Sequence, residues 1–190
     1  MLRKAHPFSL SGLVQLCHHR WTVPLVAALG TDGGARFVVL RRELSVAPQT
    51  LRRALDGAIA LGLVLPNPGY GHPLRPEYLL TERGRRLAPL CRVVSTVAGG
   101  LGETIARKWT LPVLAAVAAG AERFSEVEVA IVTASPRAAS QALHALTDCG
   151  ALERTIEEGR PPRPRYRIAP PARGLARASL ELAAIASGPA

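Results

Sequence analysis

The sequence predicts a mainly α-helical protein with small β-hairpins, built from two tandem copies of one small domain. Hydrophobic residues make up 48% of the 190 residues and aromatic residues 4%, so Ala, Leu and Val must form most of the core. A core of that composition suits helices better than a β-sandwich. The second observation is an internal repeat, which divides the chain into residues 1–95 and 96–190.

The repeat is visible as a nearly constant offset between the two halves. The segment from His19 to Pro24 reappears from Arg107 to Pro112, and the two tryptophans, Trp21 and Trp109, lie 88 positions apart. Further pairs keep offsets of 87 or 88: Phe37 and Phe124, Pro48 and Pro136, Gly62 and Gly150, Tyr78 and Tyr166. An offset held along both halves indicates a duplication, and the Gly99–Gly100 pair predicts a hinge between the copies.

In the first copy, the residue pattern predicts four helices, a two-stranded hairpin and a closing helix. The helices are expected over residues 9–19, 21–29, 37–44 and 48–61, the strands over 63–65 and 77–80, and the last helix over 82–97. Ser9 or Ser11 is expected to cap the first helix, and Gly62 to end the fourth. This order of elements is that of a winged helix-turn-helix domain.

The second copy follows the same order. Helices are expected over residues 101–107, 109–119, 124–131, 136–148 and 172–186, with strands over 151–155 and 165–168 and a wing loop over 156–164. The predicted fold is therefore two tandem winged helix-turn-helix domains arranged as a pseudo-dimer.

The chain carries a large excess of positive charge. Its 24 Lys and Arg residues against 14 Asp and Glu residues give a net charge of +10. An excess of this size favours a polyanionic partner, with nucleic acid first and an anionic membrane surface second. Solubility charge together with the codon bias of a GC-rich genome is the alternative explanation.

Composition and motifs also narrow the location and the chemistry. The longest apolar run, Leu111–Ala121, is far too short to cross a bilayer, and the N-terminal segment lacks a secretory pattern. Three cysteines without metal-ligand spacing favour a reducing cytoplasm, where we expect a nucleoid-associated protein. Cys17, His18 and His19 carry ligand-type side chains, but neighbours on a helix point in different directions. Since no catalytic motif is present either, we expect no enzyme activity, cofactor or metal site.

The second helix of a helix-turn-helix domain enters the major groove of DNA, where its N-terminal side chains reach base edges. In the first copy these side chains are Gln49, Thr50, Arg52 and Arg53, and in the second they are Arg137, Ser140, Gln141 and His144. Gln pairs bidentately with adenine and Arg with guanine. The alternative is an ordinary solvated helix face.

The wings are expected to meet phosphates or the minor groove. The first wing offers Tyr70, His72 and Arg75, and the second offers Arg160, Arg163, Arg165 and Arg167 among several prolines. Prolines would hold such a loop extended and present its guanidinium groups at low entropic cost. A polar loop that makes no DNA contact is the alternative.

The two halves differ in charge. Residues 1–95 hold 13 Lys and Arg and 5 acidic residues, a net charge of +8, whereas residues 96–190 hold 11 and 9, a net charge of +2. The helix before the predicted recognition helix carries Arg41 and Arg42 in the first copy, but Glu126 and Glu128 in the second. Because acidic side chains near phosphates weaken binding, the first copy should supply most of the DNA affinity.

Several segments resemble those of a known family. The run Arg107–Leu114 followed by Arg123–Val127 is similar to the opening of HxlR-type winged helix-turn-helix regulators, and Tyr78–Gly84 is similar to the family's segment before the last helix. The resemblance implies a bacterial transcription factor that pairs through its first and last helices. HxlR-type chains ordinarily carry one repeat, so the duplication implies an intramolecular pair in place of the homodimer. Where some members sense oxidants with a cysteine, this sequence has Phe8 and Thr96.

Together these observations predict a sequence-specific, DNA-binding transcriptional regulator that uses two recognition helices and two wings of one chain on a pseudo-palindromic site. The two recognition helices would then lie about 34 Å apart, one turn of DNA. The alternative is a tandem winged-helix scaffold for protein interactions, associated with the chromosome or with a polymerase, with weak or no specific DNA binding. A small-molecule effector is left open, as is the choice between a monomeric pseudo-dimer and a homodimer.

Overall fold

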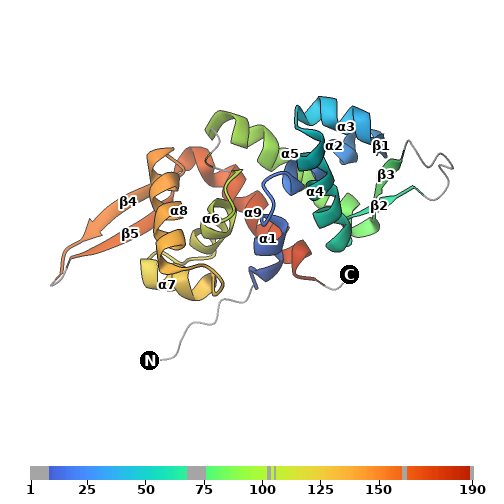
Figure 1. Ribbon diagram of the computed structural model, residues 1–190. Coiled ribbons are helices and arrows are strands. Elements are labelled where there is room, and N and C mark those ends of the chain that lie inside the picture. Colours follow the sequence, from blue (N-terminus) through green and yellow to red (C-terminus); the bar gives the residue numbers. More distant parts are fainter. Residues whose placement is uncertain (1–8, 68–75, 102–103, 105, 160–161, 189–190) are drawn as a thin grey trace.

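The computed structural model describes residues 9–67, 76–101, 104, 106–159 and 162–188. Two lobes, one for each copy, lie side by side, and helices α1, α5 and α9 lie between their centres (Figure 1). Each lobe carries a β-hairpin that points outward, so the hairpins lie at opposite ends of the molecule (Figure 1). The prediction of two winged helix-turn-helix domains arranged as a pseudo-dimer is confirmed.

The first lobe combines helices with a small antiparallel sheet. Its elements are α1 (Ser11–Leu16), α2 (Thr22–Asp32), β1 (Ala35–Arg36), α3 (Phe37–Leu44), α4 (Pro48–Ala60), β2 (Val64–Pro66), β3 (Glu77–Leu80) and α5 (Glu82–Leu101). The strand order is β1-β3-β2, with Ala35 opposite Tyr78 and Val64 opposite Leu80. The sequence predicts only a two-stranded hairpin here, because two residues are too few for strand β1 to show a pattern of its own.

The second lobe repeats the order of the first with a longer hairpin. Its elements are α6 (Thr110–Ala118), α7 (Phe124–Ala130), α8 (Pro136–Asp148), β4 (Leu152–Glu157), β5 (Arg163–Ile168), the short 3₁₀ helix η2 (Pro170–Ala172) and α9 (Arg173–Ala186). Strands β4 and β5 pair antiparallel from Leu152 and Ile168 out to Glu157 and Arg163.

Equivalent glycines end the second helix of each helix-turn-helix. Gly62 has φ of 65° and Gly150 has φ of 73°, which is the left-handed conformation that glycine adopts without steric cost. Leu63 then donates a backbone hydrogen bond to Ala58, and Ala151 donates one to Leu146. Each glycine therefore turns the chain from the recognition helix into the wing, as predicted.

The two lobes share one interface built from their outer helices. Helix α9 packs against α5, α6 and α1, and its residues Leu182 and Ala183 are fully buried. A Cβ atom added to Gly12 of α1 would lie 2.3 Å from the Ala186 carbonyl oxygen, so these two backbones are in close contact. The Arg83 guanidinium also donates to that carbonyl, and Ser187 Oγ donates to the Ser9 carbonyl at 2.6 Å. The expected pairing through first and last helices is confirmed for α1, α5 and α9.

Several expected boundaries at this interface are wrong. Helix α1 ends at Leu16 instead of His19, and its N-cap position is Leu10, although Ser9 Oγ accepts the Ser11 amide at 3.3 Å. Helix α5 continues through Gly99 and Gly100, so no hinge lies there. The helix expected over 101–107 is also not found, since α5 takes in Leu101 and the described residues 104, 106 and 107 form no α-helix.

Candidate nucleic-acid interface

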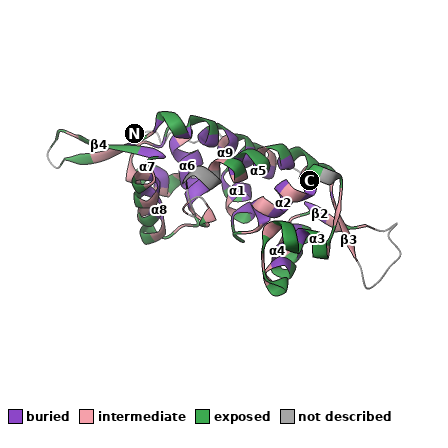
Figure 2. Cartoon of the chain, turned by 90° about the horizontal axis from the view of Figure 1, so that it is seen from above, coloured by how far each residue is buried: buried purple, intermediate pink, exposed green. Residues whose placement is uncertain are grey.

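The two predicted recognition helices, α4 and α8, lie on the same side of the molecule. Figure 2 shows both along one edge, with α5 and α9 along the opposite edge. Helix α4 packs on α2, and helix α8 packs on α6. Their buried faces are equivalent position by position: Leu51, Ala54, Leu55 and Ala58 in α4, and Ala139, Ala142, Leu143 and Leu146 in α8. Because α4 and α8 are packed equivalently, their polar faces are exposed on the same side of the molecule.

The outer face of α4 carries most of the residues predicted to contact bases. Gln49, Arg52 and Arg53 are exposed, and Thr50 is half-buried. The Arg52 guanidinium carbon lies 6.0 Å from the centre of the Phe37 ring, a distance at which a cation and an aromatic face attract each other. Arg52 is therefore oriented by α3, whereas Arg53 takes part in no ion pair among the described residues.

Tyr78 of strand β3 lies beside this face. Burial raises the pKa of the Tyr78 hydroxyl, the Asp56 carboxylate adds to that rise, and Arg52 opposes it. These effects require Arg52 and Asp56 to be near the phenol. The phenol stays protonated at neutral pH and remains a hydrogen-bond donor next to the recognition helix.

Helix α8 presents a more neutral outer face. Arg137, Gln141 and His144 are exposed and Ser140 is half-buried. The helix begins with a side-chain cap, since the Ala138 amide donates to Ser135 Oγ at 3.2 Å. Helix α4 begins at the equivalent proline after Ala47, whose side chain cannot accept such a bond. The first turn of α8 is therefore better satisfied within the protein than the first turn of α4.

The turn between the two helices differs in length between the copies. Residues 45–47 join α3 to α4, with Ser45 in the left-handed conformation at φ of 51°. Residues 131–135 join α7 to α8. The offset between the copies, 87 at Phe37 and 88 at Pro48, therefore changes in or near this turn. The longer turn of the second copy contains Val132, whose side chain is 85% exposed.

Only one of the two acidic residues before the second recognition helix is the counterpart of an arginine in the first copy. Arg41 and Arg42 lie exposed in the last turn of α3, close to the turn that leads into α4. Glu126 lies in the first turn of α7 and caps its own helix, since its carboxylate accepts the amides of Glu122 at 2.8 Å and Arg123 at 3.0 Å. Glu128 is the counterpart of Arg41 at the offset of 87 and is half-buried.

The first wing is described only at its base. Asn67 donates a backbone hydrogen bond to Glu77 at 2.8 Å, and its side-chain amide donates to the Glu77 carboxylate. Tyr70, His72 and Arg75, which the sequence places in this wing, lie outside the described residues. Their contact with DNA remains a prediction.

The second wing is a paired hairpin and not the proline-held loop that the sequence predicts. Arg163 and Arg165 lie on strand β5, and Arg160 lies outside the described residues. Arg165 forms ion pairs with Glu122 at 2.7 Å and with Glu157 at 2.8 Å. Its side chain is therefore held against the domain, whereas Arg163 is exposed.

Two further arginines join this group of ion pairs, which we call the wing-base network. Arg123 pairs with Glu157 at 2.9 Å, and Arg167 approaches Glu122 at 3.6 Å. Sequence reasoning missed the network because Glu122 is 43 positions from Arg165 and only the folded hairpin joins them. The signal that could have revealed part of the network is that Glu157 lies opposite a strand rich in arginine once the hairpin pairs.

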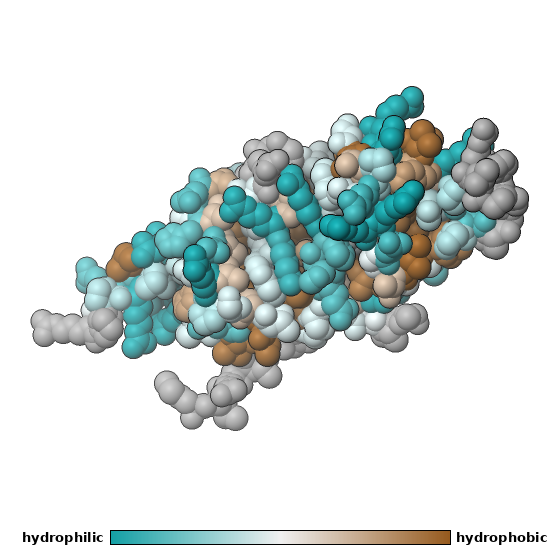
Figure 3. Space-filling model, in the orientation of Figure 1, coloured by the Kyte–Doolittle hydropathy of each residue, from teal (hydrophilic) through white to brown (hydrophobic). Residues whose placement is uncertain are grey.

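Hydrophilic side chains cover most of the face that carries α4 and α8, with scattered hydrophobic patches between them (Figure 3). A polar and predominantly basic surface between two outward hairpins suits the charged grooves of DNA.

The cysteines inside the first lobe are not poised to react. Cys17 and Cys91 are buried. Burial raises the pKa of the Cys17 thiol to about 12, and burial together with Cys17 also raises the pKa of Cys91. Since the thiolate is the reactive form, neither side chain is a nucleophile at neutral pH.

Two winged helix-turn-helix domains with their recognition helices on one side define a DNA-binding protein. The chain belongs to the HxlR-like helix-turn-helix family, whose sequence profile matches residues 16–101 and again residues 104–188. Proteins of this family are DNA-binding transcriptional regulators, which agrees with the resemblance found in the sequence. No curated protein and no solved structure matches the chain. Among the described residues, no helix has both the length and the apolar character needed to cross a bilayer.

Proposed function

We propose that this regulator binds one pseudo-palindromic DNA site with both halves of a single chain. Helices α4 and α8 would enter successive major grooves, and the two wings would contact the flanking backbone. The observation that carries this proposal is the placement of both recognition helices on one side of a shared interface. On this view the functional units are residues 1–95 and 96–190, and the chain acts as a monomeric pseudo-dimer.

The residues proposed to read or hold DNA are exposed or half-exposed polar side chains of the described residues, together with four wing residues that lie outside the described part of the chain. In the first copy they are Gln49, Thr50, Arg52, Arg53, Arg41, Arg42 and the wing residues Tyr70, His72 and Arg75. In the second copy they are Arg137, Ser140, Gln141, His144, Arg160 and Arg163. Arg165 is the weakest candidate in the sequence-based set, because its guanidinium already pairs with two carboxylates.

We further propose that the first copy supplies most of the affinity. Its exposed arginines Arg41, Arg42 and Arg53 form no ion pair among the described residues, whereas the wing-base network neutralises several arginines of the second copy. Fewer available cations release fewer counterions on binding, so the second copy would contribute a smaller electrostatic term.

A protein-docking role is the second candidate function. Val129 and Val132, at the end of α7 and just after it, are 55% and 85% exposed, and Val38 and Val39 of α3 are 68% and 42% exposed. Exposed aliphatic side chains suit a protein surface better than the phosphates of DNA. This observation favours the scaffold function for either half of the molecule.

Selection of binding sites from random DNA, followed by footprinting of the purified chain, tests the proposal. We expect a protected region that spans two half-sites about 10 base pairs apart, and an affinity that falls steeply with salt. Protection of a single half-site would support DNA binding by the first copy and protein docking by the second. No sequence preference at any salt concentration would overturn the proposal. Light scattering of the free and bound protein would separate a monomeric pseudo-dimer from a homodimer.

A further inference from the structure

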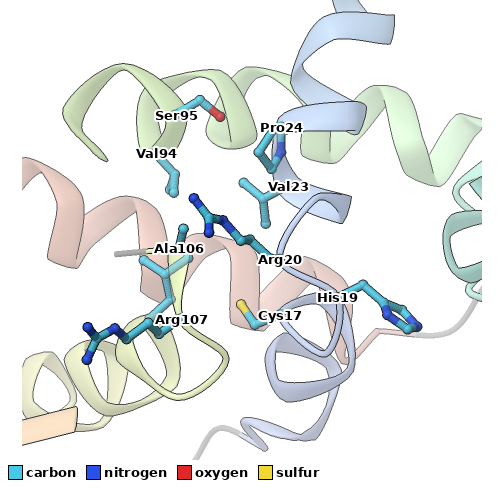
Figure 4. Close-up of a pocket in the computed structure, with 10 residues that line it drawn as sticks. Cys17, His19, Arg20, Val23, Pro24, Val94, Ser95, Ala106 and Arg107 are labelled. Carbon is cyan, nitrogen blue, oxygen red and sulfur yellow. The ribbon is translucent and has the colours of Figure 1, made fainter. Parts of the chain in front are cut away.

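A pocket of about 230 Å³ lies at the junction of the two lobes. The first copy contributes the turn before α2, with Cys17 and Arg20, together with Val23 of α2 and Val94 of α5. The second copy contributes Ala106 and Arg107, which precede α6, and Leu111 within it. Figure 4 shows the Arg20 side chain reaching from its turn toward Val94, with the Cys17 thiol directed into the same space.

The lining combines an apolar floor with basic edges. Val23, Val94 and Leu111 are buried aliphatic residues, and Arg20 and Arg107 flank the opening. A second cavity of about 350 Å³ shares Arg20 and Arg107 and adds Lys108. None of the described residues that line either cavity is acidic. A ligand with one apolar end and one negative charge matches this distribution.

The volume limits the size of the ligand. A cavity of about 150 Å³ is large enough for benzene, whereas drug-sized ligands occupy sites of about 300 Å³ or more. At about 230 Å³, this pocket holds a single ring with one small substituent. The Arg107 guanidinium at its edge favours a planar carboxylate as that substituent, because a guanidinium group binds a carboxylate with paired hydrogen bonds.

We propose that this pocket is an effector site for small aromatic carboxylates. Binding itself depends only on the pocket, but its regulatory consequence rests on the proposed function. Because both copies line the cavity, an occupant that fits best at one lobe-to-lobe geometry would favour that geometry. The spacing of α4 and α8 would shift with it, so ligand and DNA binding would be coupled.

Titration calorimetry with benzoate on the intact chain tests the site directly. We expect benzoate to bind, and benzamide, which has the same shape without the charge, to bind about tenfold more weakly. Arg107→Gln should weaken benzoate binding by about tenfold. Ala106→Leu should fill the pocket and so abolish benzoate binding. Arg154→Gln removes one exposed charge from strand β4 and is the matched control. Thermal melts of each variant verify that it is folded.

The outcomes separate this site from the proposed function. Equal binding of benzoate and benzamide, or no binding of either at millimolar concentration, would overturn the carboxylate site. A parallel DNA titration should show the dissociation constant shifting by about fivefold or more when benzoate saturates the protein. DNA binding that benzoate leaves unchanged would remove the regulatory role alone. Intact benzoate binding without any DNA binding would contradict the proposed function but would support the carboxylate site.

Discussion

The two copies of the domain place the same element beside the wing but use it differently. In the first copy, Ala35 and Arg36 form strand β1 and pair with β3 through their backbones. In the second, the equivalent residues Glu122 and Arg123 contribute one backbone bond, from Tyr166 to Glu122 at 2.7 Å, and several ion pairs. In the second copy, the ion pairs of the wing-base network therefore add side-chain contacts at the base of the hairpin.

This difference extends the charge asymmetry that the sequence already contains. The second half has a net charge of +2 against +8 for the first. Ion pairs further reduce the number of its arginine side chains that can bind phosphates. A duplicated domain needs only one copy to keep its full DNA affinity as long as both recognition helices stay aligned. The second copy is thus free to change its surface while conserving its core.

The largest expected effect compares the two recognition helices. Replacing both Arg52 and Arg53 with Ala should weaken DNA binding by about 2–6 kcal/mol, since each direct arginine contact contributes about 1–3 kcal/mol. The Arg137→Ala, Gln141→Ala double variant should lose less than half as much. Fluorescence anisotropy on a selected site, at matched salt, measures both.

All four positions are exposed or solvent-facing, so the melting temperatures of these variants should stay close to that of the parent chain. Equal losses of affinity from the two helices would break the asymmetry. A larger loss from α8 would reverse it and make the second copy the principal reader of DNA.

The next effect concerns the interface, where only the first copy has a distinct first helix among the described residues. Gly12→Ala places a Cβ atom 2.3 Å from the Ala186 carbonyl oxygen, so α1 must move away from α9. We expect a loss of about 2–3 kcal/mol in the free energy of unfolding, as for an overpacked core. Chemical denaturation measures the change.

Gly174→Ala is the matched control for this substitution. Gly174 lies in α9 with no atom within 4 Å of an added Cβ, so Ala there should raise helix stability by up to about 1 kcal/mol. If Gly12→Ala were as harmless as Gly174→Ala, the close packing of α1 on α9 would not hold the lobes together.

A smaller effect tests whether the two copies have equally constrained folds. Gly62→Ala and Gly150→Ala each force alanine into the left-handed conformation, with open space around the new Cβ. Backbone strain is then the whole cost, about 1 kcal/mol at each site. Differential scanning calorimetry should show nearly equal decreases, and a marked inequality would mean that the copies differ in backbone constraint as well as in surface.

The elements that the sequence predicts best are those marked by local signals. Helix α8 has the predicted bounds, because proline at its first position and glycine after its last turn act within a few residues. Helix α3 also has the predicted bounds, which follow from its apolar spacing. The exposed positions of α4 and α8 follow from the same helical period. Duplication adds a second, independent copy of every signal.

The features that the sequence does not predict depend on contacts between distant segments. Gly99 and Gly100 would break an isolated helix, but α5 continues through them while packing along α2 and α9. The effector pocket draws Cys17, Val94 and Arg107 from three separate segments, so no spacing reveals it. The wing-base network has the same origin, since Arg165 meets Glu122 only when strand β5 returns beside it.

The smallest effect isolates the wing-base network. Glu122→Gln removes the partner that Arg165 and Arg167 share, so both guanidinium groups become more available to phosphates. Half-exposed ion pairs contribute little, so the free energy of unfolding should fall by less than about 1 kcal/mol. DNA affinity should rise, and the slope of log affinity against log salt should steepen by about one.

Glu181→Gln makes the same charge change on α9, the helix that Figure 2 shows along the edge opposite α4 and α8. Among the described residues, it breaks the pair with Arg177. A gain of affinity confined to Glu122→Gln would locate the asymmetry in the network itself. Equal gains from both substitutions would mean that overall charge governs binding, because then the position of the removed carboxylate would not matter. The charge difference between the halves, and not the ion pairs of the second wing, would in that case account for the unequal roles of the two copies.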